Sequence, residues 1–264
     1  MIPYFPAPEI SLAMITLSPW GLMVSLGILL GVQVSVREAR ARGLKPAEIF
    51  DRLPLILLAA FLGARLVYTF GYALGDWLEN PLGFFYFWDG GWSSAGGFFG
   101  AISAGLFLIR KENSRPLRYA LIDCLAAGFP LGMAVGRLGC FIIHDHLGIL
   151  SGSFLAVAFP GVARFDLGLL ESLNMFFLVL AVGIFASRSR ASPGLLAGLI
   201  GLWYALSRFG LDFLRASDVP SPDIRYALLT PAQWLMMPLA VASGYLLIQL
   251  WRENFKSELE LRTE

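Results

Sequence analysis

Seven apolar runs of about 18 to 22 residues follow one another along the chain, and polar stretches separate them. Each run is close to the roughly 20 apolar residues that a helix needs to cross a bilayer. Spanning segments must be helices, because lipid cannot satisfy bare peptide groups. We therefore predict an all-α integral membrane protein, a single polytopic domain over residues 1–264 with seven transmembrane helices. The predicted spans are residues 19–36, 53–73, 92–109, 119–138, 166–187, 194–214 and 231–251.

Two of these runs begin with residues that favour a helix start. Ser18-Pro19 and Thr230-Pro231 each place a hydroxyl before a proline. The hydroxyl can cap a helix, and proline is well tolerated in the first turn. We expect helices to begin at both places.

The composition agrees with a membrane protein. Hydrophobic residues make up 57% and charged residues 15% of the chain, with a mean hydropathy of +0.68. A soluble domain has about 25% charged residues, so a cytosolic enzyme and a disordered chain are excluded. The two cysteines, Cys124 and Cys140, lie in apolar sequence and indicate no extracellular disulfide. The net charge of +1 indicates no nucleic-acid partner.

Basic residues predict how the spans are oriented. Residues 37–52 hold five Lys or Arg, 110–118 four, 188–190 two, and the tail after Trp251 three. The segments of the opposite side hold only Arg164, Arg215 and Arg225. Because basic loops stay in the cytoplasm, we predict an outer N-terminus and a cytoplasmic C-terminus. The N-terminal residues lack the basic region of a cleavable signal peptide, so we expect the first span to be retained.

Three arginines and two carboxylates inside the predicted spans lie in the outer half of the membrane. Arginine in hydrocarbon is costly and persists where it faces a polar interior or a cavity. One interpretation is that the charges join helices, since Arg208 and Asp212 are one turn apart. The other is a cationic cavity, open to the outer leaflet, for an anionic lipid headgroup, because arginine donates two hydrogen bonds to phosphate. The five residues are Arg65, Arg137, Glu171, Arg208 and Asp212.

Three further features have narrower interpretations. His144, Asp145 and His146 form a triplet that can exchange protons near neutral pH, or a hydrogen-bonded interfacial loop. Two histidines in i,i+2 spacing are a weak metal pattern, and we predict no metal and no cofactor. Asp123, near a cytoplasmic span end, is expected to contact water or headgroups. Small residues around Gly96 and Gly100 indicate close helix packing.

Several short motifs, in order along nearly the whole chain, resemble those of the prolipoprotein diacylglyceryl transferases. The family signature GRxGNFxNxExxG is similar to GRLGCFIIHDHLG, and the YGxxRFxxEFxRxPD element is similar to WYALSRFGLDFLRASD. The remaining matches follow the family's order. The matching segments are GARLVY (63–68), WDGGWSSAGGFFG (88–100), GRLGCFIIHDHLG (136–148), LLE (169–171), WYALSRFGLDFLRASD (203–218) and TPAQWLMMP (230–238).

The resemblance implies transfer of a diacylglyceryl group from phosphatidylglycerol to the lipobox cysteine of prolipoproteins, on the outer face of the bacterial inner membrane. The expected partners are phosphatidylglycerol and prolipoprotein signal peptides, and no metal is needed. By position, Arg137 would hold the lipid phosphate and Arg208 would be the second critical arginine, while Arg65 and Asp212 would shape the cavity. The catalytic candidates are His144, Asp145, His146 and Glu171.

The chain also departs from the family pattern, so other functions stay open. One alternative is a catalytically degenerate paralogue that binds or presents anionic phospholipid in the outer leaflet, and another is a different enzyme acting on lipid headgroups. We predict that transfer survives, because cationic neighbours lower the pKa of an entering thiol and the histidine triplet can accept its proton. The departures are Trp20 for tyrosine, Ala95 for histidine, Cys140 and Ile143 for asparagine, Asp145 for glutamate, and Phe165 for histidine.

Overall fold

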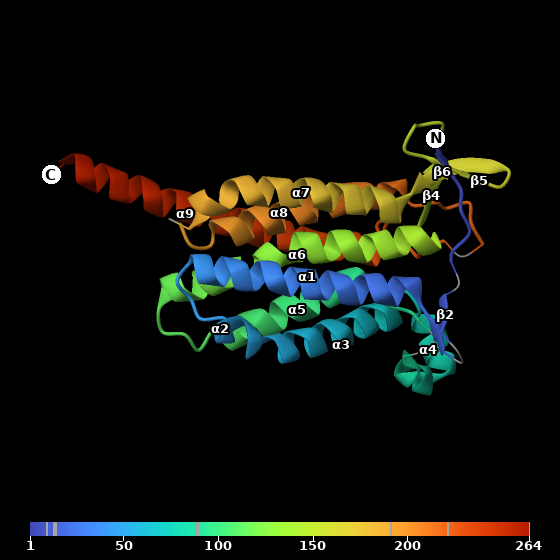
Figure 1. Ribbon diagram of the computed structural model, residues 1–264, viewed down its shortest axis with the longest axis horizontal. Helices are drawn as coiled ribbons and strands as arrows, with labels where there is room; N and C mark the ends of the chain where they lie inside the picture. The colour runs from blue at the N-terminus through green and yellow to red at the C-terminus, as the bar shows by residue number, and fades with distance from the viewer. Residues whose placement is uncertain (9, 13–14, 88–89, 191, 221, 264) are drawn as a thin grey trace.

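Long helices run side by side and form most of the molecule (Figure 1). The computed structural model describes residues 1–264 except 9, 13–14, 88–89, 191, 221 and 264. The long helices are α1 (Pro19–Ala41), α3 (Leu53–Gly71), α5 (Ser94–Ile109), α6 (Arg115–Ile143), α7 (Leu167–Ser189), α8 (Leu195–Leu211) and α9 (Pro231–Thr263). The shorter helical segments are α2 (Ala47–Phe50), α4 (Leu74–Glu79), and the 3-10 turns η1 (Pro81–Phe85) and η3 (Asp212–Leu214).

Each predicted span coincides with one of these long helices. In the described part of the chain, five helices (α1, α3, α6, α7 and α9) are long and apolar enough to cross a membrane. The other two are shorter, since α5 has 16 residues and α8 has 17. The protein is thus a multi-pass membrane protein.

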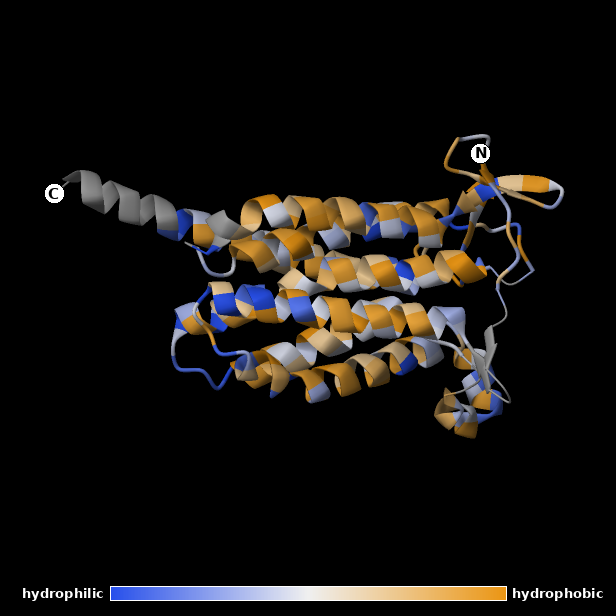
Figure 2. Ribbon diagram, in the orientation of Figure 1, coloured by the Kyte–Doolittle hydropathy of each residue, from blue (hydrophilic) through white to orange (hydrophobic). Residues whose placement is uncertain are grey.

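The outer surface of the bundle is apolar over most of its length. Figure 2 shows hydrophobic residues along the helices, while the connection around α2 is rich in hydrophilic residues. Leu29 on α1, Leu180 on α7 and Val241 on α9 are 62%, 68% and 73% exposed. Large aliphatic side chains in such number on a helical surface fit contact with lipid tails.

Side-chain caps define several helix starts. Ser18 accepts a hydrogen bond from the backbone N–H of Gly21 at the start of α1. At the start of α9, the Thr230 N–H donates to Gln233 Oε1, and the Gln233 N–H donates to Thr230 Oγ1. This reciprocal pair satisfies two N–H groups that the helix itself cannot. The predicted starts at Pro19 and Pro231 are confirmed.

Glycines let two helix pairs approach closely. A Cβ atom on Gly128 of α6 would overlap the Gly31 carbonyl of α1, and one on Gly100 of α5 would overlap the Ala59 carbonyl of α3. Such contacts are typical of small residues at membrane helix interfaces. The packing role predicted for the glycines near residue 100 is confirmed.

A small sheet lies outside the bundle and corrects the all-α prediction. Its strand order is β1-β5-β6-β4, and β5 pairs antiparallel with β6. These strands have only two to five residues, which is too few for a visible alternation of polar and apolar positions. The strands are β1 (Ile2–Pro3), β4 (Leu147–Leu150), β5 (Val157–Phe159) and β6 (Val162–Asp166), and β2 (Ile10–Leu12) pairs antiparallel with β3 (Ile15–Leu17) in a separate two-stranded sheet.

Asp123 joins three helices at the end of the bundle opposite the sheet. Its carboxylate accepts hydrogen bonds from the N–H groups of Gly194 (2.9 Å) and Ala197 (2.8 Å) at the start of α8. Arg42 lies 3.0 Å from the same carboxylate and 2.9 Å from Glu38. Asp123 is fully buried. Our expectation that it contacts water or headgroups was wrong, because it caps a neighbouring helix instead.

Candidate functional site

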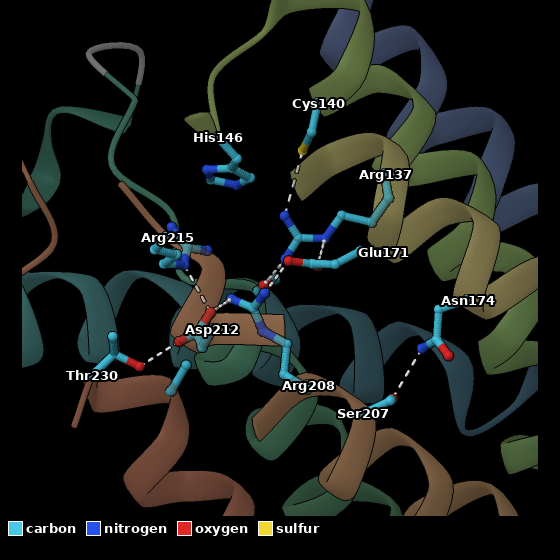
Figure 3. Close-up of polar contacts among 12 residues, drawn as sticks. Arg137, Cys140, His146, Glu171, Asn174, Ser207, Arg208, Asp212, Arg215 and Thr230 are labelled. Carbon is cyan, nitrogen blue, oxygen red and sulfur yellow. Dashed lines mark hydrogen bonds and ion pairs between the residues drawn. The ribbon is translucent and has the colours of Figure 1, made fainter. Parts of the chain in front are cut away.

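A chain of alternating charges crosses the sheet-side end of the bundle (Figure 3). Arg137 Nε lies 2.7 Å from Glu171 Oε2, and the other Glu171 oxygen accepts a hydrogen bond from Arg208. Arg208 Nη2 lies 3.1 Å from Asp212 Oδ1, and that oxygen also accepts from Arg215 Nε at 2.7 Å. Arg215 in turn donates to Asp223. The members of this ion chain are Arg137, Glu171, Arg208, Asp212, Arg215 and Asp223.

Three adjacent helices supply the centre of the ion chain. Arg137 lies two turns before the end of α6, Glu171 lies in the second turn of α7, and Arg208 lies in the last turn of α8. Each is at most 4% exposed, and Asp212 is fully buried. Thr230 donates a further hydrogen bond to Asp212 and thereby connects the start of α9 to the ion chain.

The ion chain is balanced in charge, with three guanidinium groups and three carboxylates. Burying a charge is costly unless a partner of opposite sign lies beside it. The predicted cationic cavity is therefore corrected, because every arginine of the ion chain has a carboxylate partner. Spare hydrogen-bonding capacity remains at Arg208 Nε and at the Tyr204 hydroxyl, which are buried and have no partner among the described residues.

Arg137 has two further contacts, both at its guanidinium end. Nη2 donates to Ser94 Oγ at 2.5 Å, and Nη1 donates to Cys140 Sγ at 3.7 Å. Ser94 is the first residue of α5, so α5, α6 and α7 meet at this one side chain. A neutral hydroxyl and a thiol are weaker partners than a carboxylate. This end of Arg137 is therefore the part of the ion chain that an incoming anion can engage most easily.

Arg65 lies apart from the ion chain, contrary to the cluster predicted from depth. In the described part of the chain, its guanidinium donates five hydrogen bonds to backbone carbonyl groups of the segment between α4 and α5. Five carbonyl bonds use the full donor set of one arginine. Arg65 thus holds this outer segment against α3. The acceptors are the carbonyls of Gly83, Phe84, Tyr86, Gly90 and Gly91.

The two histidines of the triplet point in different directions. His144 Nδ1 lies 2.7 Å from Asp166 Oδ2, and Nε2 lies 3.1 Å from the Phe5 carbonyl. With both ring nitrogens engaged, His144 ties α6 to the sheet and the N-terminal segment. His146 instead lies beside Arg215, across from Cys140 and Arg137 (Figure 3).

Asp145 and His146 lie next to the ion chain, and both have shifted pKa values. Burial raises the pKa of Asp145 to about 6, against the opposing effect of Arg137. Burial and the nearby positive charges of Arg215 and Arg137 hold the pKa of His146 well below its usual range. His146 is therefore a neutral imidazole near pH 7, with a free lone pair on one ring nitrogen.

Comparison with known proteins identifies the family. The family profile described as prolipoprotein diacylglyceryl transferase matches residues 9–249. A phosphatidylglycerol–prolipoprotein diacylglyceryl transferase of Chromohalobacter salexigens is 33% identical over 247 residues, which cover 89% of this chain and 90% of the relative. One of the same name from Rhizobium meliloti is 32% identical over 265 residues, 93% of this chain and 92% of the relative. The chain belongs to the prolipoprotein diacylglyceryl transferase family.

Membership in this transferase family confirms the resemblance seen in the motifs. The names of the relatives give no support to the non-catalytic alternative. Ala95, which replaces the histidine of the family element, is buried in the main apolar core with 1% exposure.

Sequence reasoning missed four members of the site. Arg215 was assigned to an outer loop, although the arginine after DFL is part of the family element that the sequence resembles. Ser94 and Cys140 are small and lie in apolar surroundings, so neither gave a signal of its own. Asp223 had no sequence signal at all.

Proposed function

We propose that the protein transfers a diacylglyceryl group from phosphatidylglycerol to the cysteine thiol of a lipoprotein precursor. The observation that carries the proposal is the buried ion chain, which ends at the guanidinium of Arg137. Family membership supports the same reaction, since the relatives are named for it.

In the proposed reaction, a thiolate sulfur attacks the glycerol carbon that bears the phosphate ester. A carbon–sulfur bond forms, the carbon–oxygen bond to phosphate breaks, and glycerol phosphate leaves with the bonding electrons. Negative charge grows on the leaving phosphate, and donors placed in advance at that position lower the barrier. Arg137 is in place to do this, because the partners of Nη1 and Nη2 among the described residues are the neutral side chains of Cys140 and Ser94.

The other members of the ion chain have positioning roles in this proposal. Glu171 binds both Arg137 and Arg208, so it fixes the orientation of the Arg137 guanidinium group. Asp212 holds Arg208 and Arg215 together. When a phosphate arrives beside Arg137, Glu171 keeps Arg208 as a partner and stays neutralised.

Transfer can be tested with purified protein, phosphatidylglycerol labelled in its acyl chains and a lipobox peptide. We expect the label to move to the peptide. A peptide with serine in place of cysteine, and labelled phosphatidylethanolamine as donor, are the matched controls and should give no labelled peptide. An unlabelled cysteine peptide under all conditions would contradict the proposal.

The proposal places all seven long helices across a bacterial inner membrane, with the ion chain toward the outer face. The basic connection around α2 and the C-terminal end of α9 lie at the opposite end of the bundle from the sheet (Figure 1). Arg137 near the end of α6, Glu171 near the start of α7 and Arg208 in the last turn of α8 place the ion chain at the sheet-side end. The positive-inside rule puts this basic end in the cytoplasm.

Reporter fusions test this orientation. A reporter fused after Trp251 should be active only if it requires the cytoplasm, and one inserted in residues 74–90 only if it requires the outside. Each site receives both reporters, so every fusion has its own control. The opposite pattern would place the ion chain on the cytoplasmic face and overturn the proposed orientation.

A further inference from the structure

A cavity lies between the end of α5 and the start of α6. The connection between these two helices is at the end of the bundle opposite the sheet (Figure 1). Three arginines, a tyrosine, two isoleucines and a leucine line the cavity, whose volume is about 230 Å³. Sites that enclose a whole small-molecule ligand measure roughly 300–1,000 Å³. This cavity therefore suits one part of a ligand, such as a headgroup, while the rest of the ligand stays outside.

The lining of the cavity is charged at the helix ends and apolar one turn deeper in the bundle. On α5, Leu106 precedes Arg110 by four residues, and on α6, Ile122 follows Arg118 by four residues. Four residues of helix correspond to about 6 Å along the axis. Leu106 is about half exposed on the apolar outer surface of the bundle. The order of charged and apolar groups thus matches a phospholipid, whose phosphate lies outside its acyl chains.

The cavity has an excess of positive charge. Arg115 lies 2.8 Å from Glu253 of α9, but both side chains are about half exposed, and such a pair is weak enough for an arriving anion to compete. The guanidinium carbon of Arg110 lies 3.9 Å from the centre of the Phe107 ring. In the described part of the chain, no carboxylate forms an ion pair with Arg110 or Arg118. Three arginines therefore share one carboxylate.

Other arginines at the same end of the bundle are already neutralised. Arg52 lies 2.6 Å from Glu112, and Arg42 lies 3.0 Å from Asp123. The start of α6 adds a further positive contribution beside the cavity, because the N-terminal end of a helix carries a partial positive charge. The cavity arginines thus keep their charge available for an anion from outside the chain.

We propose that this cavity binds the phosphate of an anionic phospholipid of the cytoplasmic leaflet, whose acyl chains lie along Leu106 and Ile122. Arginine forms paired hydrogen bonds with phosphate oxygens, and basic pockets between transmembrane helices on the cytoplasmic side typically bind anionic lipid headgroups. This site lies at the opposite end of α6 from Arg137, so it is separate from the site of the proposed transfer. Only the choice of leaflet rests on the proposed orientation.

Native mass spectrometry of the purified full-length protein in a neutral detergent measures this binding. The protein is titrated with phosphatidylserine, which is anionic but is not the donor of the proposed reaction, and in parallel with phosphatidylcholine. We expect phosphatidylserine to bind at least about tenfold more tightly, because each arginine near an anionic lipid increases the affinity severalfold. Equal affinities for the two lipids would overturn the proposed site.

Two double variants test whether the cavity arginines bind the lipid. The variant with Arg110→Gln and Arg118→Gln removes two charges from the cavity, and we expect it to bind phosphatidylserine at least about tenfold more weakly than the wild type. The matched control combines Arg37→Gln with Arg40→Gln, two exposed residues at the end of α1 that do not line the cavity. This control should bind like the wild type. Unchanged binding in the cavity variant, or an equal loss in both variants, would overturn the site.

Competition with glycerol 3-phosphate distinguishes a lipid from a soluble phosphate compound. Glycerol 3-phosphate presents a phosphate to the arginines but has no acyl chains for the apolar part of the cavity. We expect it to displace phosphatidylserine only at concentrations at least about tenfold higher, since burial of a few methylene groups contributes this much affinity. Displacement at equal concentrations would overturn the lipid as the occupant.

Photo-cross-linking locates the bound lipid in the unmodified protein, so a folding defect of a variant cannot affect the result. Phosphatidylserine with a diazirine at the glycerol end of one acyl chain is added to the wild type, irradiated and mapped by peptide mass spectrometry. We expect the label on peptides from residues 106–122. Label confined to the sheet-side end, or spread evenly over the helices, would overturn the site. None of these measurements involves transfer, so binding here by a protein without transferase activity supports the site and contradicts only the proposed function.

Discussion

Arg137→Ala is expected to lower transfer by at least about 100-fold, the loss that follows when one donor to a developing charge is removed. In the described part of the chain, the two terminal nitrogens of the Arg137 guanidinium have a thiol and a hydroxyl as partners rather than a carboxylate. Arg137→Lys should recover little activity, because an ammonium cannot reproduce the two-pronged contact with phosphate. Initial rates of label transfer to the lipobox peptide measure both effects.

Arg225→Ala is the matched control for this prediction. Arg225 belongs to the same outer side of the chain, but its side chain is exposed and lies outside the ion chain. Its substitution should leave the transfer rate near that of the wild type. Wild-type transfer in Arg137→Ala would remove the phosphate-binding role of Arg137.

Glu171→Gln is expected to lower the free energy of unfolding by about 3–5 kcal/mol, the loss typical of a buried ion pair that is deprived of one partner. Glu171 is 3% exposed and binds two arginines at once. In the variant, Arg137 and Arg208 each lose the carboxylate of Glu171 as a partner. The guanidinium of Arg137 is then no longer held in one orientation, so transfer should fall as well. Denaturant titration of the protein in detergent measures the change in stability.

Asp218→Asn provides the comparison for Glu171→Gln. Asp218 also pairs with an arginine, Arg164, but its side chain is 51% exposed. Solvent screens exposed pairs, and their loss has little effect on stability. We expect a lower unfolding midpoint for Glu171→Gln than for Asp218→Asn. Equal midpoints would contradict the prediction that the buried contacts of Glu171 stabilise the fold more than an exposed ion pair.

The helices could be predicted because their signal is local. Each long helix coincides with an apolar run, and the caps at Ser18 and Thr230 involve residues within three positions. The strands near the ion chain could not be predicted in this way. Strands of two to five residues depend on partners far along the sequence, as in the pairing of Ile2 with Val157.

The site was predictable in part. The similar predicted depth of four residues in the membrane indicated a common cluster, and the structure joins them in one ion chain. They are Arg137, Glu171, Arg208 and Asp212. Predicted depth in the membrane wrongly grouped Arg65 with these residues. Its partners are backbone carbonyls of a segment about 20 residues away, and every residue type has such a carbonyl. Predicted depth also could not show that the charges would balance, since that depends on Arg215 and Asp223 in the segment after α8.

The balance of charges weakens one sequence-based argument. We expected three arginines to lower the pKa of an entering thiol, but each arginine of the ion chain has a carboxylate beside it. Opposite charges close together produce a smaller field at a neighbouring thiol than the arginines alone.

The central claim is that the protein moves diacylglycerol from phosphatidylglycerol to a cysteine thiol. The most direct measurement is the mass of the lipobox peptide after incubation with the purified protein, together with the amount of glycerol phosphate released. We expect a peptide that gains one diacylglyceryl group in a thioether bond, with one glycerol phosphate released for each peptide modified. An unmodified peptide with no glycerol phosphate released, or glycerol phosphate released without peptide modification, would contradict the account.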